Sequence, residues 1–345
     1  MILEELEKRR LPELLSDQKQ MLDTLLKTEY GYPPEKAPVS AKELKRDENY
    51  NGGNAVYLET ELTCHLPCGD FSFPVKAVLP KTKKSAASVV YISFSSEVPD
   101  KYLPAEEIAD QGVAVFSFNY NDVTPDSEEA FTKGLGGLLY HGKREKGDGG
   151  AIALWAWAAS RVLDWALTFE CVNKFRTSVA GHSRLGKTAL LAGALDDRFR
   201  VVYSNDSGCG GAALYRGKIG ESLQRITSVF PYWFEKDFGE WAGKEDELPF
   251  DQHWLIACAF PRKVYVASAS EDSWADPVSE YLSLCAVSSY YTRLCLKGFY
   301  YPDRLPTSGD TISVDGDFGY HLRKGTHFLT RYDWKHYLEF LTWPS

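Results

Sequence analysis

Long apolar runs are missing from this chain. Within its 345 residues, no stretch reaches the roughly 18 consecutive apolar side chains of a membrane-spanning helix. The N-terminal segment, MILEELEKRRLPELLSDQ, is acidic early and lacks the apolar centre of a signal peptide. The sequence therefore predicts a cytoplasmic protein with no membrane partner, or a secreted one if a leader has been removed.

Positive charge is also scarce. A net charge of −9 at pH 7 argues against nucleic acid as a partner. Seven cysteines, an odd and scattered set, make a poor disulfide framework. The segment CHLPC at 64–68 resembles half of a zinc site, but no second pair of ligands at metal spacing completes it. We expect free thiols there, and neither metal nor cofactor.

What the chain does contain is an alternation of short apolar runs with helical segments. The expected strands are 57–63, 71–79, 88–94, 113–118, 175–180, 199–204, 263–268 and 318–322. The expected helices are 105–111, 150–170, 188–195, 220–230, 277–291 and 332–341, with one or two more before residue 30. This pattern predicts an α/β fold with a mostly parallel sheet covered by helices on both faces. Without a repeat or clear linker, we expect a monomer with one domain over 1–345, in which 1–48 form a helical and loop extension and 32–53 are loop.

The stretch 178–190, SVAGHSRLGKTAL, reads as strand, sharp turn and helix, and it fits two chemistries that exclude each other. One is a nucleophile elbow, which would raise Ser183 on a strained turn at the end of a strand. The other is a phosphate loop, because GHSRLGKT matches G-x-x-x-x-G-K-[ST] without a mismatch. Against the phosphate loop, the motif lies past the middle of the chain, and Arg184 is an unusual cation in a turn that wraps phosphate. Against a generic elbow, the second glycine, Gly186, comes one residue late.

The elbow requires an acid and a histidine later in the chain. Asp206 follows the strand after the elbow, and Asp272 follows the strand KVYVAS. Asp276 is a weaker third acid. For the base, His327 follows the expected last strand, while His321 falls within that strand and His336 within the closing helix. Both acids stay candidates, and His327 is the preferred base. His182 would point away from Ser183, and His253 is most simply structural.

Several separate motifs in one order resemble the glucuronoyl esterases, the fifteenth carbohydrate esterase family. They are GHSRLGK, SNDSGCGGAAL (204–214), LPFDQH (248–253), ASASEDSWADP (267–277) and YHLRKGTHF (320–328), and the resemblance covers about residues 150–340. It implies an α/β-hydrolase fold, a three-layer αβα sandwich, and a metal-independent serine esterase. Its expected substrate is an ester of 4-O-methyl-glucuronic acid on xylan, as in lignocellulose.

The resemblance also implies residue roles. Ser183 corresponds to the nucleophile and Arg184 to the group that stabilises the oxyanion. Lys187 is similar to a lysine that contacts sugar hydroxyls, although a plain helix lysine is an equal interpretation. Trp274 resembles a tryptophan near the glucuronate, with a core aromatic as the alternative. Glu221 and Gln224, three apart on an expected helix, match polar sugar contacts or else a solvated helix face.

The first half of the chain departs from the usual hydrolase pattern. The stretch 92–97, ISFSSE, stands where an oxyanion loop rich in glycine is typical, and it has no glycine.

Three other functions remain as alternatives. They are a xylan or carbohydrate acetyl esterase on the same fold, a nucleotide-binding protein with a phosphate loop, and a carbohydrate-binding relative without activity.

Overall fold

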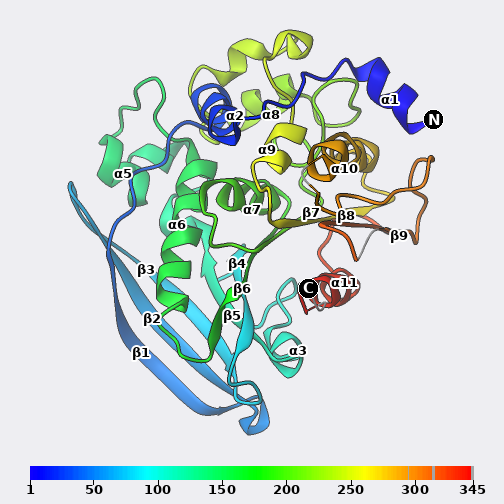
Figure 1. Cartoon of the computed structure of the whole chain (residues 1–345). Coiled ribbons are helices and arrows are strands. Elements are labelled where there is room, and N and C mark those ends of the chain that lie inside the picture. Colours follow the sequence, from blue (N-terminus) through cyan, green and yellow to red (C-terminus); the bar gives the residue numbers. More distant parts are fainter. Residues whose placement is uncertain (294, 313–314, 343–345) are drawn as a thin grey trace.

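One twisted sheet runs through the protein (Figure 1), whose computed structural model describes residues 1–293, 295–312 and 315–342. Its strands are β1 (Val39–Tyr50), β2 (Ala55–Leu66), β3 (Gly69–Pro80), β4 (Ala86–Ser93), β5 (Val113–Asn119), β6 (Val172–His182), β7 (Val201–Asn205), β8 (Lys263–Ala269), β9 (Thr311–Ile312) and β10 (Phe318–Arg323). In space they follow the order β1-β2-β3-β5-β4-β6-β7-β8-β10-β9. The strands from β5 to β10 in this order are parallel, and the pairs outside them are antiparallel. The predicted mostly parallel central sheet is confirmed.

Helices cover both faces of this sheet (Figure 1). They are α1 (Ile2–Arg9), α2 (Gln18–Leu25), α3 (Ala105–Asp110), α4 (Tyr120–Val123), α5 (Gly134–Tyr140), α6 (Ala151–Ala166), α7 (Arg184–Leu195), α8 (Leu223–Val229), α9 (His253–Ala257), α10 (Pro277–Thr292) and α11 (Arg331–Thr342). Helices α6, α7 and α10 pack on one face around a core that includes Leu154 and Leu191. Helices α3 and α11 pack on the other around Ile108 and Trp334. The predicted three-layer αβα sandwich of the α/β-hydrolase type is confirmed.

Strand β1 corrects the sequence analysis, which expected a loop over 32–53 and only helix and loop in the extension 1–48. Residues Val39–Tyr50 instead form the edge strand of the sheet, paired antiparallel with β2. Ten of its twelve residues are exposed, so no hydrophobic alternation marks it. Its charged side chains suit an edge, because charge discourages a further chain from pairing there.

Helix α6, which confirms the helix expected at 150–170, is buried on nearly every side. In this helix only Asp164 is not buried. The helix packs on the sheet beside helix α7, and strands β1 and β2 also contact it. A helix covered on all sides needs apolar residues all round.

The N-terminal segment, for which one or two helices were expected, forms two, with Pro12 between them. Arg9 at the end of α1 is buried and donates hydrogen bonds to the carbonyl of Arg216 and to Ser279 Oγ. After α2, a five-residue π-helix (Leu26–Tyr30) carries the fully buried Glu29. In the described part of the chain, no helix has the length and apolar character needed to cross a membrane.

Candidate active site

Ser183 is the single residue between β6 and α7, and its backbone is strained. Its φ is 59° and its ψ is −127°, a combination rare for a residue with a side chain. A Cβ on Gly181 would lie 2.0 Å from the Leu185 carbonyl oxygen, so only glycine fits that position. A Cβ on Gly186 would lie 3.0 Å from Ser207 Cβ. The late second glycine therefore lets α7 approach the loop after β7, and the turn is a nucleophile elbow.

The same geometry contradicts the phosphate loop. One residue between strand and helix leaves no loop that could wrap a phosphate. Lys187 is buried, and its Nζ donates hydrogen bonds to the carbonyls of Ser207 (2.5 Å) and Cys209 (2.6 Å). The match to the phosphate-loop pattern is therefore coincidental.

His327 and Asp272 meet at the same end of the sheet. The Nδ1 atom of His327 lies 2.5 Å from Oδ2 of Asp272. The loops that carry them are joined by two backbone hydrogen bonds, from Ser270 N to Arg323 O and from Glu271 N to Gly325 O, both 2.9 Å. This arrangement leaves Nε2 as the ring nitrogen that faces a substrate or Ser183.

Asp272 is held in its ionised form. Burial opposes ionisation, but the hydrogen bond and the charge of His327 outweigh it, so the pKa of Asp272 lies below its usual value. Its other oxygen accepts a 3.2 Å hydrogen bond from the Ala275 amide. A carboxylate fixed in this way can orient the imidazole and stabilise its protonated form.

Asp206 lies beside this pair without hydrogen-bonding the histidine. It is buried, and one oxygen is 3.4 Å from Arg323 Nη2. Burial, together with the nearby Glu280 and Asp272, raises the pKa of Asp206 well above its usual value. Of the two acids predicted, Asp272 makes the direct contact to His327, and Asp206 contacts Arg323 instead.

Asp206, Asp272 and His327 also bring ligand-type atoms within 4.8 Å of one another. Their surroundings do not suit a metal ion. His327 Nδ1 is already paired with Asp272, and the Arg323 guanidinium occupies the side next to Asp206. A cation that the protein itself supplies thus balances this acidic cluster.

His182 belongs to the site, although the sequence analysis set it aside as pointing away. It lines the same cavity as Ser183, and its ring centroid lies 4.6 Å from that of His327. Its Nδ1 is 2.6 Å from Asn205 Oδ1. Burial and the neighbouring His327 lower the pKa of His182 to about 3, which keeps it neutral. No sequence spacing distinguishes such a packed histidine from an unrelated one.

Arg184 reaches from the elbow to Asp126 in the segment before α5. Its Nη1 pairs with Asp126 Oδ2, and its guanidinium lies 4.8 Å from the Trp233 ring centroid. Asp126 also accepts hydrogen bonds from Trp233 Nε1 (2.6 Å) and the Tyr120 hydroxyl (2.9 Å). This salt bridge is largely buried and holds a cation beside Ser183. Asp126 is a residue that the sequence analysis missed, because nothing local marks it.

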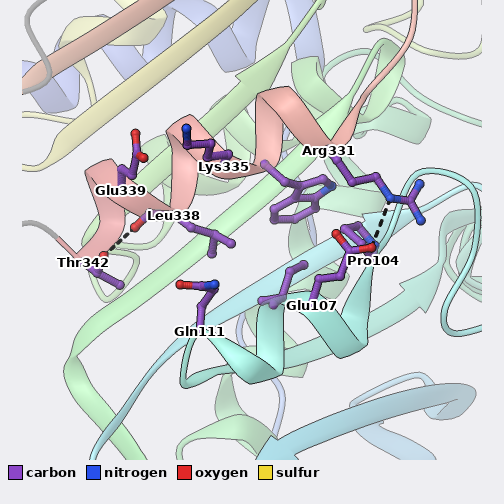
Figure 2. A pocket seen from close by; sticks show the side chains of 10 residues that line it. Pro104, Glu107, Gln111, Arg331, Lys335, Leu338, Glu339 and Thr342 are labelled. Atoms are coloured by element: carbon purple, nitrogen blue, oxygen red, sulfur yellow. Dashed lines mark hydrogen bonds and ion pairs between the residues drawn. The ribbon is translucent and has the colours of Figure 1, made fainter. Parts of the chain in front are cut away.

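Ser183, Arg184 and His327 line one open cavity of about 520 Å³, together with Phe94 and Tyr102. Within the described residues, no hydrogen bond joins Ser183 Oγ to His327, which is common for such a pair before substrate binds. A second groove of about 340 Å³ lies between α3 and α11 and contains none of the predicted site residues (Figure 2). Of these two cavities, the first is the one that the nucleophile candidate, the base candidate and Arg184 share.

The residues predicted to contact substrate differ in exposure and in the contacts they make. Trp274 is 53% exposed, which excludes the core interpretation. Glu221 precedes helix α8 instead of lying on it, so it does not share a helix face with the exposed Gln224, as the sequence analysis had expected. The Glu221 amide donates to the Trp274 carbonyl (3.0 Å), and its carboxylate lies 4.0 Å from Lys187 Nζ. Lys187 is thus committed to holding the 207–209 loop, and its third N–H is the one left for Glu221 or a ligand.

The remaining candidates are structural. His321 lies within β10, and its Nε2 is 2.7 Å from the buried Asp333. His336 lies in α11, as expected. His253 is buried against the carbonyl of Pro12. Asp276 caps α10 by accepting from the Ser279 amide.

Comparisons with known proteins agree with this geometry. A family model described as fungal glucuronyl esterase matches residues 68–295. A carbohydrate esterase from an unknown prokaryotic organism is 41% identical over 68% of this chain and 54% of its own length. A 4-O-methyl-glucuronoyl methylesterase from Wolfiporia cocos is 27% identical over 64% of this chain and 56% of its own. The chain thus spans little more than half the length of these curated relatives.

A solved structure matches a larger share of both chains. A glucuronoyl esterase from Solibacter usitatus is 28% identical, with a TM-score of 0.87 over 95% of this chain and 92% of its own. The residues matched by the family model include the elbow and Asp272. Since the family model covers more than half of the residues, the chain belongs to the glucuronoyl esterase family.

Proposed function

We propose that this protein is a serine carboxylesterase that hydrolyses esters of 4-O-methyl-D-glucuronic acid. The observation that carries the proposal is the shared cavity of Ser183 and His327, with Asp272 bound to the far nitrogen of the imidazole. Family membership and the names of the relatives support the choice of the acid side of the ester. Residues 1–345 are proposed to form one catalytic domain, because a single sheet spans the chain from β1 to β10.

The reaction proceeds in two halves. His327 Nε2 takes the proton of Ser183 Oγ as the oxygen attacks the ester carbonyl carbon. The tetrahedral intermediate expels the alcohol, which receives that proton from His327, and an acyl-enzyme remains. Water, deprotonated by His327, then attacks the acyl carbon. The second tetrahedral intermediate breaks its bond to Ser183 Oγ, which regains the proton from His327, and glucuronate is released.

Arg184 stabilises the negative charge that develops on the carbonyl oxygen. Its backbone N–H follows the nucleophile, which is the usual position of an oxyanion donor. Its guanidinium, fixed by Asp126 and Trp233, adds a cation without any reorganisation during the reaction. The Ser95 amide, in the stretch that replaces the usual glycine-rich loop, already donates to Ser93 Oγ at 3.0 Å. Arg184 thereby takes over part of the role of that loop.

Asp272 orients His327 and stabilises the imidazolium. Asp206 does not hydrogen-bond the imidazole, and burial together with the nearby Glu280 and Asp272 raises its pKa, which disfavours a second negative charge beside the histidine. The exposed Trp274 and the neighbouring Glu221, whose carboxylate lies 4.0 Å from Lys187 Nζ, would contact the sugar. Gln224 lies farther along α8 as an outer contact.

The test is the hydrolysis of benzyl glucuronate by wild type and by Ser183→Ala, with an acetyl ester as a second substrate. Loss of a triad member should lower kcat by several orders of magnitude. A matched control is Ser40→Ala, because Ser40, His65 and Asp70 form the same order of hydrogen bonds (2.9 and 2.8 Å) on the exposed face of β1 to β3. Ser40→Ala should leave the rate unchanged.

Each outcome is distinct. Turnover of the glucuronate ester that disappears in Ser183→Ala supports the proposal. Turnover of the acetyl ester alone would move the function to a carbohydrate acetyl esterase on the same triad. Binding of uronate without turnover of either ester would contradict an enzymatic function.

A further inference from the structure

Arg323, the last residue of β10, sits under the loop that carries His327. Its side chain is buried, and it contacts backbone on both sides of the histidine. Its Nη2 donates to the carbonyl of Thr326 (2.7 Å) and to the carbonyl of Phe328. Its Nη1 donates to the carbonyl of Lys324 at 3.3 Å. The guanidinium therefore binds the residues directly before and after His327.

The guanidinium is itself fixed from behind. Its Nε lies 3.0 Å from Oδ2 of Asp333, which is fully buried. The same carboxylate accepts from the amide of Thr330 at 2.6 Å, and its other oxygen is 2.7 Å from His321. The buried Asp333 carboxylate therefore fixes the orientation of the Arg323 guanidinium.

The loop is shaped to admit this side chain. Gly325 has a φ of +123°, and a Cβ there would lie 2.9 Å from Arg323 Nη1. The carbonyls of Arg323 and Gly325 also receive the backbone bonds from Ser270 and Glu271, in the loop of Asp272. The position of Arg323 is therefore coupled to both members of the His327–Asp272 pair.

We propose that Arg323 is a positioning residue for the reaction: it holds the backbone around His327 so that the imidazole meets both Asp272 and Ser183. The proposal rests on the esterase function given above. The guanidinium does not line the cavity of Ser183 and touches no reacting atom. It acts through the histidine, and its salt bridge to Asp206 also balances the acidic cluster below the imidazole.

The alternative is that Arg323 only stabilises the fold, and Arg262 provides the matched control. Arg262 is likewise buried, and it donates to the carbonyls of Gly193, Asp196 and Phe199 at the opposite end of the strands. Replacing either arginine leaves several buried carbonyls without a donor. Only Arg323 is connected to the site.

The experiment compares Arg323→Met in the wild-type and in the His327→Ala backgrounds, with kcat and KM measured on benzyl glucuronate and folding checked by near-UV circular dichroism. In the wild-type background, we expect kcat to fall roughly 10- to 100-fold with KM nearly unchanged, because a displaced base costs about this much. In the His327→Ala background, the same substitution should change the residual kcat less than about twofold, since residues acting as one unit are not additive. Arg262→Met should lower Tm and retain kcat.

An equal fractional loss in both backgrounds would overturn the proposal, and so would an unchanged kcat in folded Arg323→Met. If Arg323→Met does not fold, Arg323→Lys answers the question, because it keeps the charge and loses most of the carbonyl contacts. It should show an intermediate loss of kcat that again disappears in the His327→Ala background. A His327→Ala variant with full activity would instead refute the proposed function itself.

Discussion

His327 Nδ1 lies 2.5 Å from Asp272 Oδ2, although 55 residues separate the two in the chain. They meet because β8 and β10 are parallel neighbours, with Arg323 opposite Ala269 at their ends. A parallel pair places both following loops at the same edge of the sheet. The elbow after β6 reaches that edge as well, so all three groups converge there.

The two candidate acids should behave differently when each is replaced by asparagine. Asp272→Asn removes the charge that orients His327, and we expect kcat to fall by roughly 10³- to 10⁴-fold. Asp206→Asn changes a carboxyl that does not hydrogen-bond His327, so kcat should fall less than about tenfold. Steady-state kinetics on benzyl glucuronate measure both. A larger loss in Asp206→Asn would make Asp206 the dominant acid.

Asp126 should influence the rate through Arg184. In Asp126→Asn the guanidinium loses its charged partner. We expect the transition state to lose about 1.5–3 kcal/mol of stabilisation, so that kcat falls roughly 10- to 100-fold. Asp164→Asn is the control, because Asp164 pairs with Arg161 and Arg198 away from the cavity. Equal effects of the two substitutions on kcat would contradict a role for the Asp126–Arg184 pair.

Substitutions of Trp274 and Lys187 should have different effects: the first on substrate binding, the second on the stability of the fold. Trp274 is exposed, so Trp274→Ala should leave Tm unchanged and raise KM by roughly tenfold, as lost apolar contact of about 1.4 kcal/mol implies. Lys187→Met leaves the carbonyls of Ser207 and Cys209 without a donor and should destabilise the fold by roughly 1–3 kcal/mol for each. Thermal unfolding and KM measured on the same samples test both. A large drop in Tm for Trp274→Ala would mean that its role is packing.

Glu29 should make stability depend on pH. Its carboxyl accepts from Tyr215 and Gln252, but burial dominates and raises its pKa from 4.5 to about 8. The folded state therefore keeps a proton that the unfolded state releases above pH 4.5. This contribution is full below the unfolded pKa and is lost at about 1.4 kcal/mol per unit as pH rises towards 8.

Glu29→Gln should flatten that slope by about this amount, because glutamine does not titrate. Glu280, whose pKa burial raises to about 7, contributes in the same direction and leaves part of the slope in place. The measurement is the free energy of unfolding in urea at several pH values between 5 and 8, with the exposed Glu61→Gln as control. An unchanged slope in Glu29→Gln would show that the carboxyl ionises in the folded protein.

Motif order allowed much of the site to be predicted. A strand, a glycine, a serine and a helix predict an elbow, since local sterics alone determine that turn. Acids and a histidine that follow later strands could be named as candidates, because parallel strands end at one edge. The edge strand β1 could not be predicted, since both its faces are exposed and its pattern is that of a loop.

The sequence by itself thus determined the layered α/β architecture, the nucleophile turn, and the few acids and histidines that could act with Ser183. Each of these rests on local periodicity or on chain order. Only the tertiary structure showed that Asp272 and not Asp206 hydrogen-bonds His327, placed His182 against His327, and joined Asp126 to Arg184 and Arg323 to the histidine loop. These contacts connect residues far apart in the chain. Their energies depend on distance and burial, which no local pattern of residues encodes.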